Sequence, residues 1–267
     1  MFQGSGTRGR GADRNRHLSR GSWLMLAVLL LVSAPGQARD LRVVFSQYTP
    51  PYVLDNGQGI VVEIVRQALA HHGHEVDPVF LPIGRGFLMF AQGRVDGTAI
   101  IKRNSGLQAH YSAPFMRYHN HAIALESREL GLDGLTDLAG RSIIAFQNAH
   151  KYLGPDFGEA VADNPDYKEM GNQKTQVLML LKGRVDVVVM DRAIFRFYRG
   201  QLIREGRVSG DQGIDYFALF PPTPYRCAFT DPAIRNDFND GLRRLRASGT
   251  YDAIFAEYAE RYFEVER

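Results

Sequence analysis

The side chains that could do chemistry in this chain gather where apolar segments end. Asp191 directly follows the apolar run 187–190, and Gln147 and Asn148 follow the run 142–146. Open α/β sheets bind ligands beyond the carboxyl ends of their strands, so a carboxylate and two amides in these places favour a polar binding site. Burying an unpaired carboxylate is costly, which indicates that Asp191 is not a casual surface residue. The alternative is an N-cap for the next helix, and the two roles are compatible.

Two aromatic side chains flank a stiff loop after the first expected strand. Tyr48 and Tyr52 enclose Pro50 and Pro51, whose rings fix the backbone φ angle. Aromatic faces beside a cleft offer stacking and cation–π contacts to a ligand. Tyr52 could instead belong to a hydrophobic core, so Tyr48 is the preferred ligand contact.

A repeated tetrapeptide marks the elements that must position these residues. The sequence Gly-Arg-Val-Asp at 93–96 recurs at 183–186, and each copy follows one apolar stretch and precedes another. A helix stopped by glycine, a short turn and an unbroken apolar strand make up half of a βαβ unit. Because helix, stop and strand recur together, we expect two similar α/β lobes rather than a chance recurrence of turn residues.

Composition and charge limit the classes of function. The chain has 267 residues and is 45% hydrophobic, so a sizeable core is expected. Its formal net charge of +3 comes from the N-terminus, because 27 basic and 28 acidic residues remain once the five arginines and one aspartate of 1–38 are set aside. This balance argues against binding nucleic acid. The single cysteine, Cys227, excludes an internal disulfide, and its place on an expected strand predicts a buried, inert thiol.

The N-terminus has the pattern of an export signal. An arginine-rich stretch precedes the apolar run 23–32, and small residues precede a cleavage point after Ala38. The run is short for a transmembrane helix, so an uncleaved anchor is the lesser alternative. No cysteine lies near the cleavage point, which argues against a lipid anchor. We expect residues 1–38 to be a signal peptide and the mature protein to be periplasmic.

The rest of the hydrophobic pattern predicts alternating strands and helices. Strands are expected at 41–45, 76–81, 98–101, 121–126, 142–146, 167–170, 187–190 and 225–229, with helices at 60–70, before each repeat, at 233–246 and at 251–263. The chain leaves the first lobe through 121–126 and returns through 224–229, and two crossings make a hinge with a cleft. The predicted lobes are 39–124 with 227–267, and 125–226. The basic segment 196–207 is expected to be a solvated helix face.

Further motifs are informative through their order and spacing over 40–264. They are Leu41-Arg42-Val43, Pro50-Pro51-Tyr52, Gly59 with Glu63, Gly93-x-x-Asp96, Tyr111-Ser112-Ala113-Pro114-Phe115, Asp137-Leu138-Ala139-Gly140-Arg141, Gly183-x-x-Asp186 with Asp191, Phe238-Asn239-x-x-Leu242 and Gly249-Thr250-Tyr251. This series resembles family 3 of the bacterial extracellular solute-binding proteins, the polar amino acid receptors of ABC transporters.

The resemblance implies a type II periplasmic-binding-protein-like fold, with two α/β lobes joined by a two-strand hinge. It implies a monomer that binds a small polar solute, such as an amino acid or a related amine or carboxylate, and delivers it to an inner-membrane ABC permease. It implies neither a cofactor nor a metal. Within it, Tyr48 and Tyr52 match aromatics that pack on the ligand, and Asp191 matches the acid that pairs with the ligand's ammonium group. Gln147 and Asn148 occupy the turn that holds the ligand's carboxylate, with a plain helix cap as the alternative.

Basic residues depart from the family's pattern. Arg85 resembles a subgroup with Pro-Trp-x-Arg, although Ile83 replaces the ring, and an anion contact and a solvated charge are equal alternatives. The loop after the first repeat usually carries an arginine that clamps the ligand's α-carboxylate. Leu107 lies near that position in this chain. Either Lys102 or Arg103 takes over the role, or the ligand is not an ordinary α-amino acid.

Catalysis is not expected, because the chain lacks Gly-x-Ser-x-Gly, a phosphate-binding loop and His-Glu-x-x-His. The same fold hosts a cyclohexadienyl dehydratase, so an exported lyase is one alternative, and a sensory partner of a membrane receptor is another. The histidines are expected to be scattered on the surface rather than to bind metal. Six of the eight histidines come close enough in sequence to raise the question, at 71, 72, 74, 110, 119 and 121.

Overall fold

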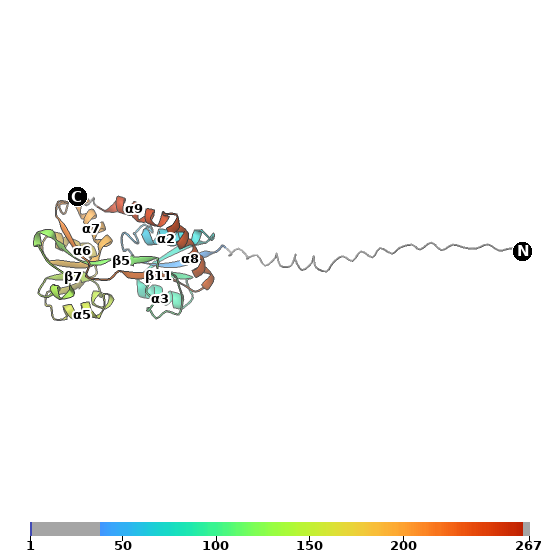
Figure 1. Ribbon diagram of the computed structural model, residues 1–267, viewed down its shortest axis with the longest axis horizontal. Helices are drawn as coiled ribbons and strands as arrows, with labels where there is room; N and C mark the ends of the chain where they lie inside the picture. The colour runs from blue at the N-terminus through green and yellow to red at the C-terminus, as the bar shows by residue number, and fades with distance from the viewer. Residues whose placement is uncertain (2–37, 264–267) are drawn as a thin grey trace. The chain divides into compact units, whose positions relative to one another are not determined.

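The computed structural model describes Met1 and residues 38–263 (Figure 1). The predicted signal peptide, residues 1–38, lies outside the described residues apart from its two end residues. No described helix combines the length and the hydropathy that crossing a bilayer would require.

The first sheet has six strands, in the order β2-β1-β3-β11-β4, with β5 also pairing with β11. The first three strands run parallel, whereas β11 runs antiparallel to its neighbours. The strands are β1 Asp40–Ser46, β2 Glu75–Leu81, β3 Gly97–Ile101, β4 His110–Tyr111, β5 Met116–Tyr118 and β11 Thr223–Phe229. The helices of this part are α2 Ile60–Ala70, α3 Ile83–Ala91, α8 Pro232–Ala247 and α9 Thr250–Tyr262.

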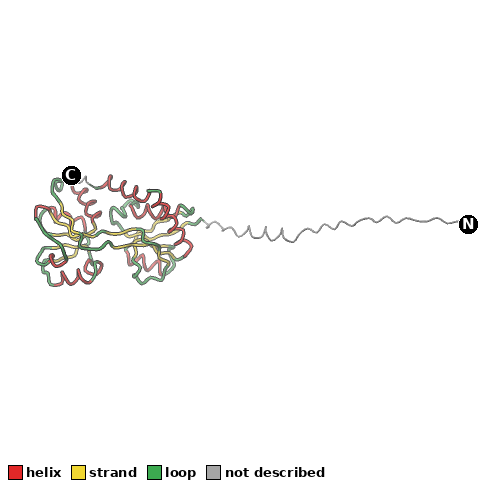
Figure 2. The backbone as a smooth tube through the Cα atoms, in the orientation of Figure 1, coloured by secondary structure: helices red, strands yellow, loops and turns green. Residues whose placement is uncertain are grey.

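Alternation along β1 explains how helices cover both faces of this sheet. Val43 and Phe45 pack in the cluster that holds the buried residues of α2 and α8, whereas Val44 packs with Phe90 of α3. Successive strand residues point to opposite faces, so a strand buried on both sides is apolar at every position. In Figure 2 the strands of both sheets lie between the helices that cover them.

The second sheet has five strands, in the order β10-β6-β9-β7-β8. Strands β7, β8 and β9 run parallel, and β6 and β10 are antiparallel additions. The strands are β6 Asn120–Leu125, β7 Ile143–Phe146, β8 Tyr167–Met170, β9 Val187–Asp191 and β10 Ile214–Phe217. Its helices are η2 Glu126–Arg128, η3 Leu135–Leu138, α4 Ala149–Tyr152, α5 Pro155–Ala162, α6 Gln173–Leu181 and α7 Arg192–Arg204. The two sheets confirm the expected two-lobed α/β fold.

The repeated tetrapeptide ends a helix and fixes the start of a neighbouring strand in both lobes. Gly93 and Gly183 follow α3 and α6 with φ angles of 64° and 65°, the left-handed conformation that ends a helix. The Asp96 carboxylate then accepts a hydrogen bond from the Arg42 N–H at 2.8 Å, and the Asp96 N–H donates to the Arg42 carbonyl. In the second lobe the Asp186 carboxylate and N–H make the same pair of contacts with Ser142, at 3.0 and 3.1 Å. Each aspartate therefore fixes the start of the neighbouring strand, β1 or β7.

The chain passes between the two sheets twice, once between β5 and β6 and once between β10 and β11. Strand β6 pairs only within the second sheet, so the first passage lies ahead of it, at His119, rather than within the strand. The predicted lobe boundaries, 124/125 and 226/227, remain a proposal, and the sheets favour moving them to about 119 and 222. Helix α9 adds a third link, because the Arg204 guanidinium of α7 donates to the Tyr262 carbonyl at 3.2 Å.

The expectation of a solvated basic helix at 196–207 is wrong. Helix α7 buries Phe197, Tyr198, Arg199 and Leu202, because it packs against α6 and α9. Arginines stand both beside these positions, at 192, 196 and 204, and among them, at Arg199, so they mask the amphipathic pattern in the sequence. Cys227 is a buried free thiol of β11, as expected, and burial raises its pKa well above the usual value.

Candidate functional site

A cavity of about 480 Å³ lies at the carboxyl ends of strands from both sheets. The last residue of each of four strands lines it: Ser46 of β1, Ile101 of β3, Phe146 of β7 and Asp191 of β9. The remaining lining comes from the loops after β1 and β3, the turn after β7, α3, both passages, α4 and the starts of α6 and α7. Parallel strands place polar loops and helix N-termini at this edge, and the volume falls in the range of small-molecule sites.

Asp191 lies in this lining, but its carboxylate is already engaged by four donors. Oδ1 accepts from the Tyr52 hydroxyl at 2.8 Å and from the N–H groups of Ala193 and Ile194 at 3.0 and 3.2 Å. Oδ2 accepts from the His119 N–H at 2.7 Å. Burial raises the pKa of the Asp191 carboxyl, and these hydrogen bonds oppose the shift. The structure therefore shows the N-cap role for α7, together with a bridge to the first lobe.

The two tyrosines of the proline loop have different surroundings. Tyr52 is buried in the core, and its ring stacks on Tyr118 with centroids 4.7 Å apart. Burial raises the pKa of Tyr52 well above its usual value, and Asp191 adds to the shift. Tyr48 is 47% exposed and lies outside the cavity lining. Burial raises the pKa of Tyr198, and the nearby Tyr48 adds to that shift. The structure thus brings Tyr52 to Asp191 and leaves Tyr48 away from the cavity.

The turn after β7 is shaped by a carboxylate that the sequence did not reveal. Asn148 adopts a left-handed conformation with φ of 63°, and its N–H donates to Glu169 Oε2 at 2.7 Å. The His150 N–H and the Tyr167 hydroxyl donate to Oε1 at 3.0 and 2.7 Å, and His150 Nδ1 lies 2.7 Å from the same oxygen. This turn places Gln147 in the cavity lining, whereas Asn148 lies outside it.

Lys102 spans the two lobes at the cavity. Its ammonium nitrogen donates to the Tyr152 carbonyl of α4 at 3.3 Å and lies 5.4 and 5.9 Å from the ring centroids of Tyr152 and Tyr225. Burial lowers the pKa of Lys102. An ammonium group held between aromatic faces, without a carboxylate partner among the described residues, is available to an anionic ligand.

The other predicted basic contacts lie away from the cavity. Arg85 of α3 and Arg103 after Lys102 are exposed, and neither belongs to the lining. Leu107, near the position of the expected clamping arginine, packs against the small core beneath α3. Of the eight predicted ligand contacts, the structure brings Lys102, Gln147 and Asp191 together in the lining.

Sequence reasoning missed several lining residues: Phe87, Lys151, Tyr152, Gln173 and Tyr225. Lys151 and Tyr152 follow the Gln147 turn closely, and their position beyond the end of β7 was the available signal. Gln173 is the first residue of α6, and its buried side-chain Oε1 has no hydrogen-bond partner among the described residues. Nothing local in the sequence separates Phe87 and Tyr225 from core aromatics.

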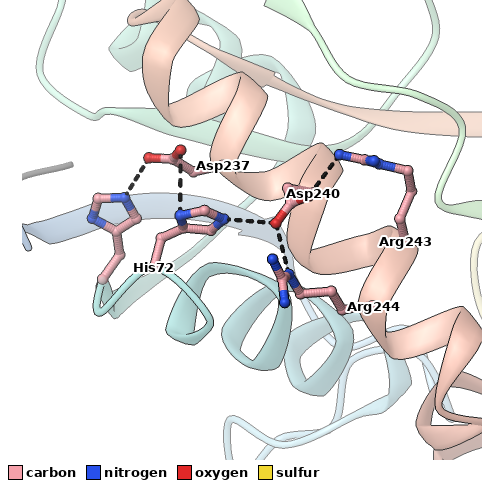
Figure 3. Close-up of polar contacts among 6 residues, drawn as sticks. His72, Asp237, Asp240, Arg243 and Arg244 are labelled. Carbon is pink, nitrogen blue, oxygen red and sulfur yellow. Dashed lines mark hydrogen bonds and ion pairs between the residues drawn. The ribbon is translucent and has the colours of Figure 1, made fainter. Parts of the chain in front are cut away.

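The histidines near α2 are not scattered as expected. His72 Nε2 lies 3.1 Å from Asp240 Oδ2, and buried His74 Nε2 lies 2.9 Å from Asp237 Oδ2, so both histidines join α8 (Figure 3). Arg244 also binds Asp240, at 2.8 Å. These contacts tie the end of α2 to α8, far along the chain. No group of three or more His, Cys, Asp or Glu residues in the described part is arranged to hold a metal ion.

Neither a family model nor a curated protein matches this chain. Solved structures do match it. An ancestral arginine-binding protein bound to glutamine is 21% identical, over 82% of this chain and 97% of its own, with a TM-score of 0.60. A histidine kinase sensor domain with similarity to periplasmic binding proteins is 24% identical, over 83% and 96%, with a TM-score of 0.61. Substrate-binding domain 2 of GlnP from Lactococcus lactis, in an open conformation, is 20% identical, over 88% and 99%, with a TM-score of 0.61.

At these identities the likeness concerns the fold. It agrees with the two sheets, the two passages between them and the cavity at their strand ends. The chain therefore has the two-lobed α/β fold of periplasmic binding proteins, which confirms at the level of the fold its resemblance to family 3 solute-binding proteins.

Proposed function

We propose that this protein is an exported, non-catalytic receptor that binds a small polar solute between its lobes and delivers it to an inner-membrane ABC permease. The observation that carries the proposal is the cavity lined by strand ends from both sheets. A solute in that place contacts both lobes at once. It therefore favours the closed state by its differential affinity for the two arrangements.

The proposed contacts follow from the lining. Lys102 serves the first lobe and Gln147 the second, and both present polar atoms to the cavity. Asp191 orders the start of α7 beside the ligand, and Tyr52 acts through Asp191 rather than by direct contact. This assignment replaces Tyr48, Arg85, Arg103 and Asn148 as direct contacts, because none of them belongs to the lining.

A binding role without turnover is supported by the chemistry of the lining. Its single carboxylate, that of Asp191, is 3% exposed and already accepts four hydrogen bonds from the protein, which leaves it poorly placed to exchange a proton with a solute. The solved proteins of this fold described above are named as binding proteins, a substrate-binding domain and a sensor domain.

The test is calorimetric titration of the protein exported from cells that express the full chain. The panel contains amino acids, amines and small carboxylates, with X-ray scattering to follow the radius of gyration. We expect one class of solute to bind with a stoichiometry of one and to reduce the radius of gyration. Absence of binding across the whole panel would contradict the proposal.

The cellular location of the protein and the identity of its membrane partner need separate tests. Cell fractionation should recover the protein from the periplasm after removal of the leader. Affinity capture with the ligand-loaded protein should recover a membrane permease, whereas recovery of a receptor kinase would replace transport by sensing.

A further inference from the structure

The charges of the cavity do not suit a cationic solute. Besides the Asp191 carboxylate, its lining carries the ammonium groups of Lys102 and Lys151. Asp191 is only 3% exposed, and its carboxylate already accepts four hydrogen bonds from the protein, three at Oδ1 and one at Oδ2. The accessible charges of the lining are therefore positive.

Neither lysine has its charge balanced by the protein. No ion pair joins Lys102 or Lys151 to a carboxylate in the described part of the chain. Lys102 is half-buried, and burial lowers its pKa, so holding the ammonium form there carries a desolvation cost. A ligand anion would relieve that cost with a charge-assisted hydrogen bond.

The walls of the cavity are aromatic. Five aromatic residues belong to the lining, together with isoleucines of β3, α3 and α7; the five are Phe87, Tyr118, Phe146, Tyr152 and Tyr225. Phe146 and Tyr152 face each other with centroids 6.5 Å apart, and Tyr225 lies beside Tyr118 with centroids 4.8 Å apart. Aromatic walls favour a flat apolar body, which stacks on them or meets their edges.

We infer that the solute is a small aromatic carboxylate, with its carboxylate between Lys102 and Lys151 and its ring among the aromatic walls. This inference rests on the proposed function and narrows its solute class. The two lysines then take the place of the arginine expected near Leu107 as partners of the ligand carboxylate, because Leu107 packs against the small core beneath α3. The amide groups of Gln147 and Gln173 remain to bind polar substituents of the ring or chain.

The test is calorimetric titration of the full-chain product at pH 7 with three matched probes: phenylacetate, phenylacetamide and phenethylamine. Arginine, glutamine and putrescine are titrated beside them. We expect phenylacetate to bind at least about 10-fold more tightly than its neutral amide, since a charge-assisted hydrogen bond is worth about 1.4 kcal/mol or more. Phenethylamine and putrescine should not bind.

Variants distinguish the contribution of Lys102 and Lys151 to binding from a general effect of removing a positive charge. Lys102→Met and Lys151→Met should each weaken phenylacetate binding at least about 10-fold, and Lys102→Arg should restore most of the loss. Lys168→Met is the matched control, because Lys168 is exposed on β8 and lies outside the lining. Circular dichroism melts confirm that each variant is folded.

The outcomes distinguish this inference from the proposed function. Binding of arginine, glutamine or putrescine in preference to phenylacetate overturns the inference and leaves the receptor proposal standing. Phenylacetate binding that both methionine variants retain at full strength overturns the inference as well. Absence of binding by every probe overturns the inference, and the wider panel of amino acids, amines and small carboxylates then decides the receptor proposal.

Discussion

Replacing Glu169 with glutamine tests how the second lobe presents its side of the cavity. The carboxylate accepts from two backbone N–H groups and the Tyr167 hydroxyl, and it lies 2.7 Å from His150 Nδ1. These contacts fix the left-handed turn at Asn148, which precedes Lys151 and Tyr152 in the lining. Glutamine keeps the shape of the side chain but removes the charge and turns an N–H₂ group toward donors.

The magnitude follows from the pKa of this group. Burial alone would raise it, but the hydrogen bonds from His150, Tyr167 and Asn148 outweigh burial and lower the pKa of Glu169 from 4.5 to about 2. At 1.36 kcal/mol per pH unit this corresponds to about 3 kcal/mol. The side chain retains 19% exposure, so solvent screening reduces the value. We expect Glu169→Gln to lower the free energy of unfolding by about 2 kcal/mol at pH 7.

The pH dependence has a definite sign. The folded-state pKa lies below the unfolded one, so the contribution of Glu169 is fully present above about pH 4.5 and is lost as the pH falls toward 2. Glutamine does not titrate. Urea unfolding at pH 7, 5 and 3 measures the difference in the free energy of unfolding between wild type and variant. This difference should stay nearly constant from pH 7 to pH 5 and fall to less than half of that value at pH 3.

The control is Glu159→Gln, an exposed residue of α5 with no hydrogen bond or ion pair among the described residues. The free energy of unfolding of the Glu159→Gln variant should differ little from that of wild type at every pH. The reasoning is refuted if Glu169→Gln costs the same at pH 3 as at pH 7, because the charge would then not be what holds the turn.

Two further predictions concern packing and the Asp191 bridge. Gly241→Ala should destabilise the protein by about 2 kcal/mol in thermal melts, because a Cβ there would collide with the Ala68 carbonyl of α2, whereas Gly84→Ala in α3 meets open space and should be neutral or stabilising. Equal melting shifts for the two glycines would contradict this reasoning. In urea unfolding, Tyr52→Phe should cost about 1 kcal/mol and Asp191→Ala about 3 kcal/mol, since the second change leaves several buried donors unsatisfied. A cost for Tyr52→Phe as large as that for Asp191→Ala would contradict this reasoning, because the loss of one hydrogen bond to Asp191 would then equal the loss of all four.

Much of the architecture could be predicted because its strands are buried on both faces. The apolar runs of β3 and β9 stand out in the sequence, and the glycine before each marks the end of a helix. Short or partly exposed strands such as β4, β5 and β10 carry no such signal, since their positions depend on pairing with distant strands. Helix α5 also escaped notice, because it begins at a proline and buries only two side chains.

Site residues could be predicted from the sequence where their position at the end of a strand is enough to place them at the cavity. Asp191 and Gln147 stand at strand ends, and both reach the cavity. The choice between Tyr48 and Tyr52 depends on which side of the proline loop faces the core, which the sequence does not encode locally. The roles of Lys151 and Tyr225 depend on the turn held by Glu169 and on the return of β11 from the other lobe.

The most direct test of the receptor account is a crystal structure of the protein with the solute that calorimetry identifies. We predict electron density for the solute between the two sheets, in contact with Lys102 from the first lobe and Gln147 from the second. Density for the solute on one lobe alone, or at a surface outside this cavity, would contradict the account.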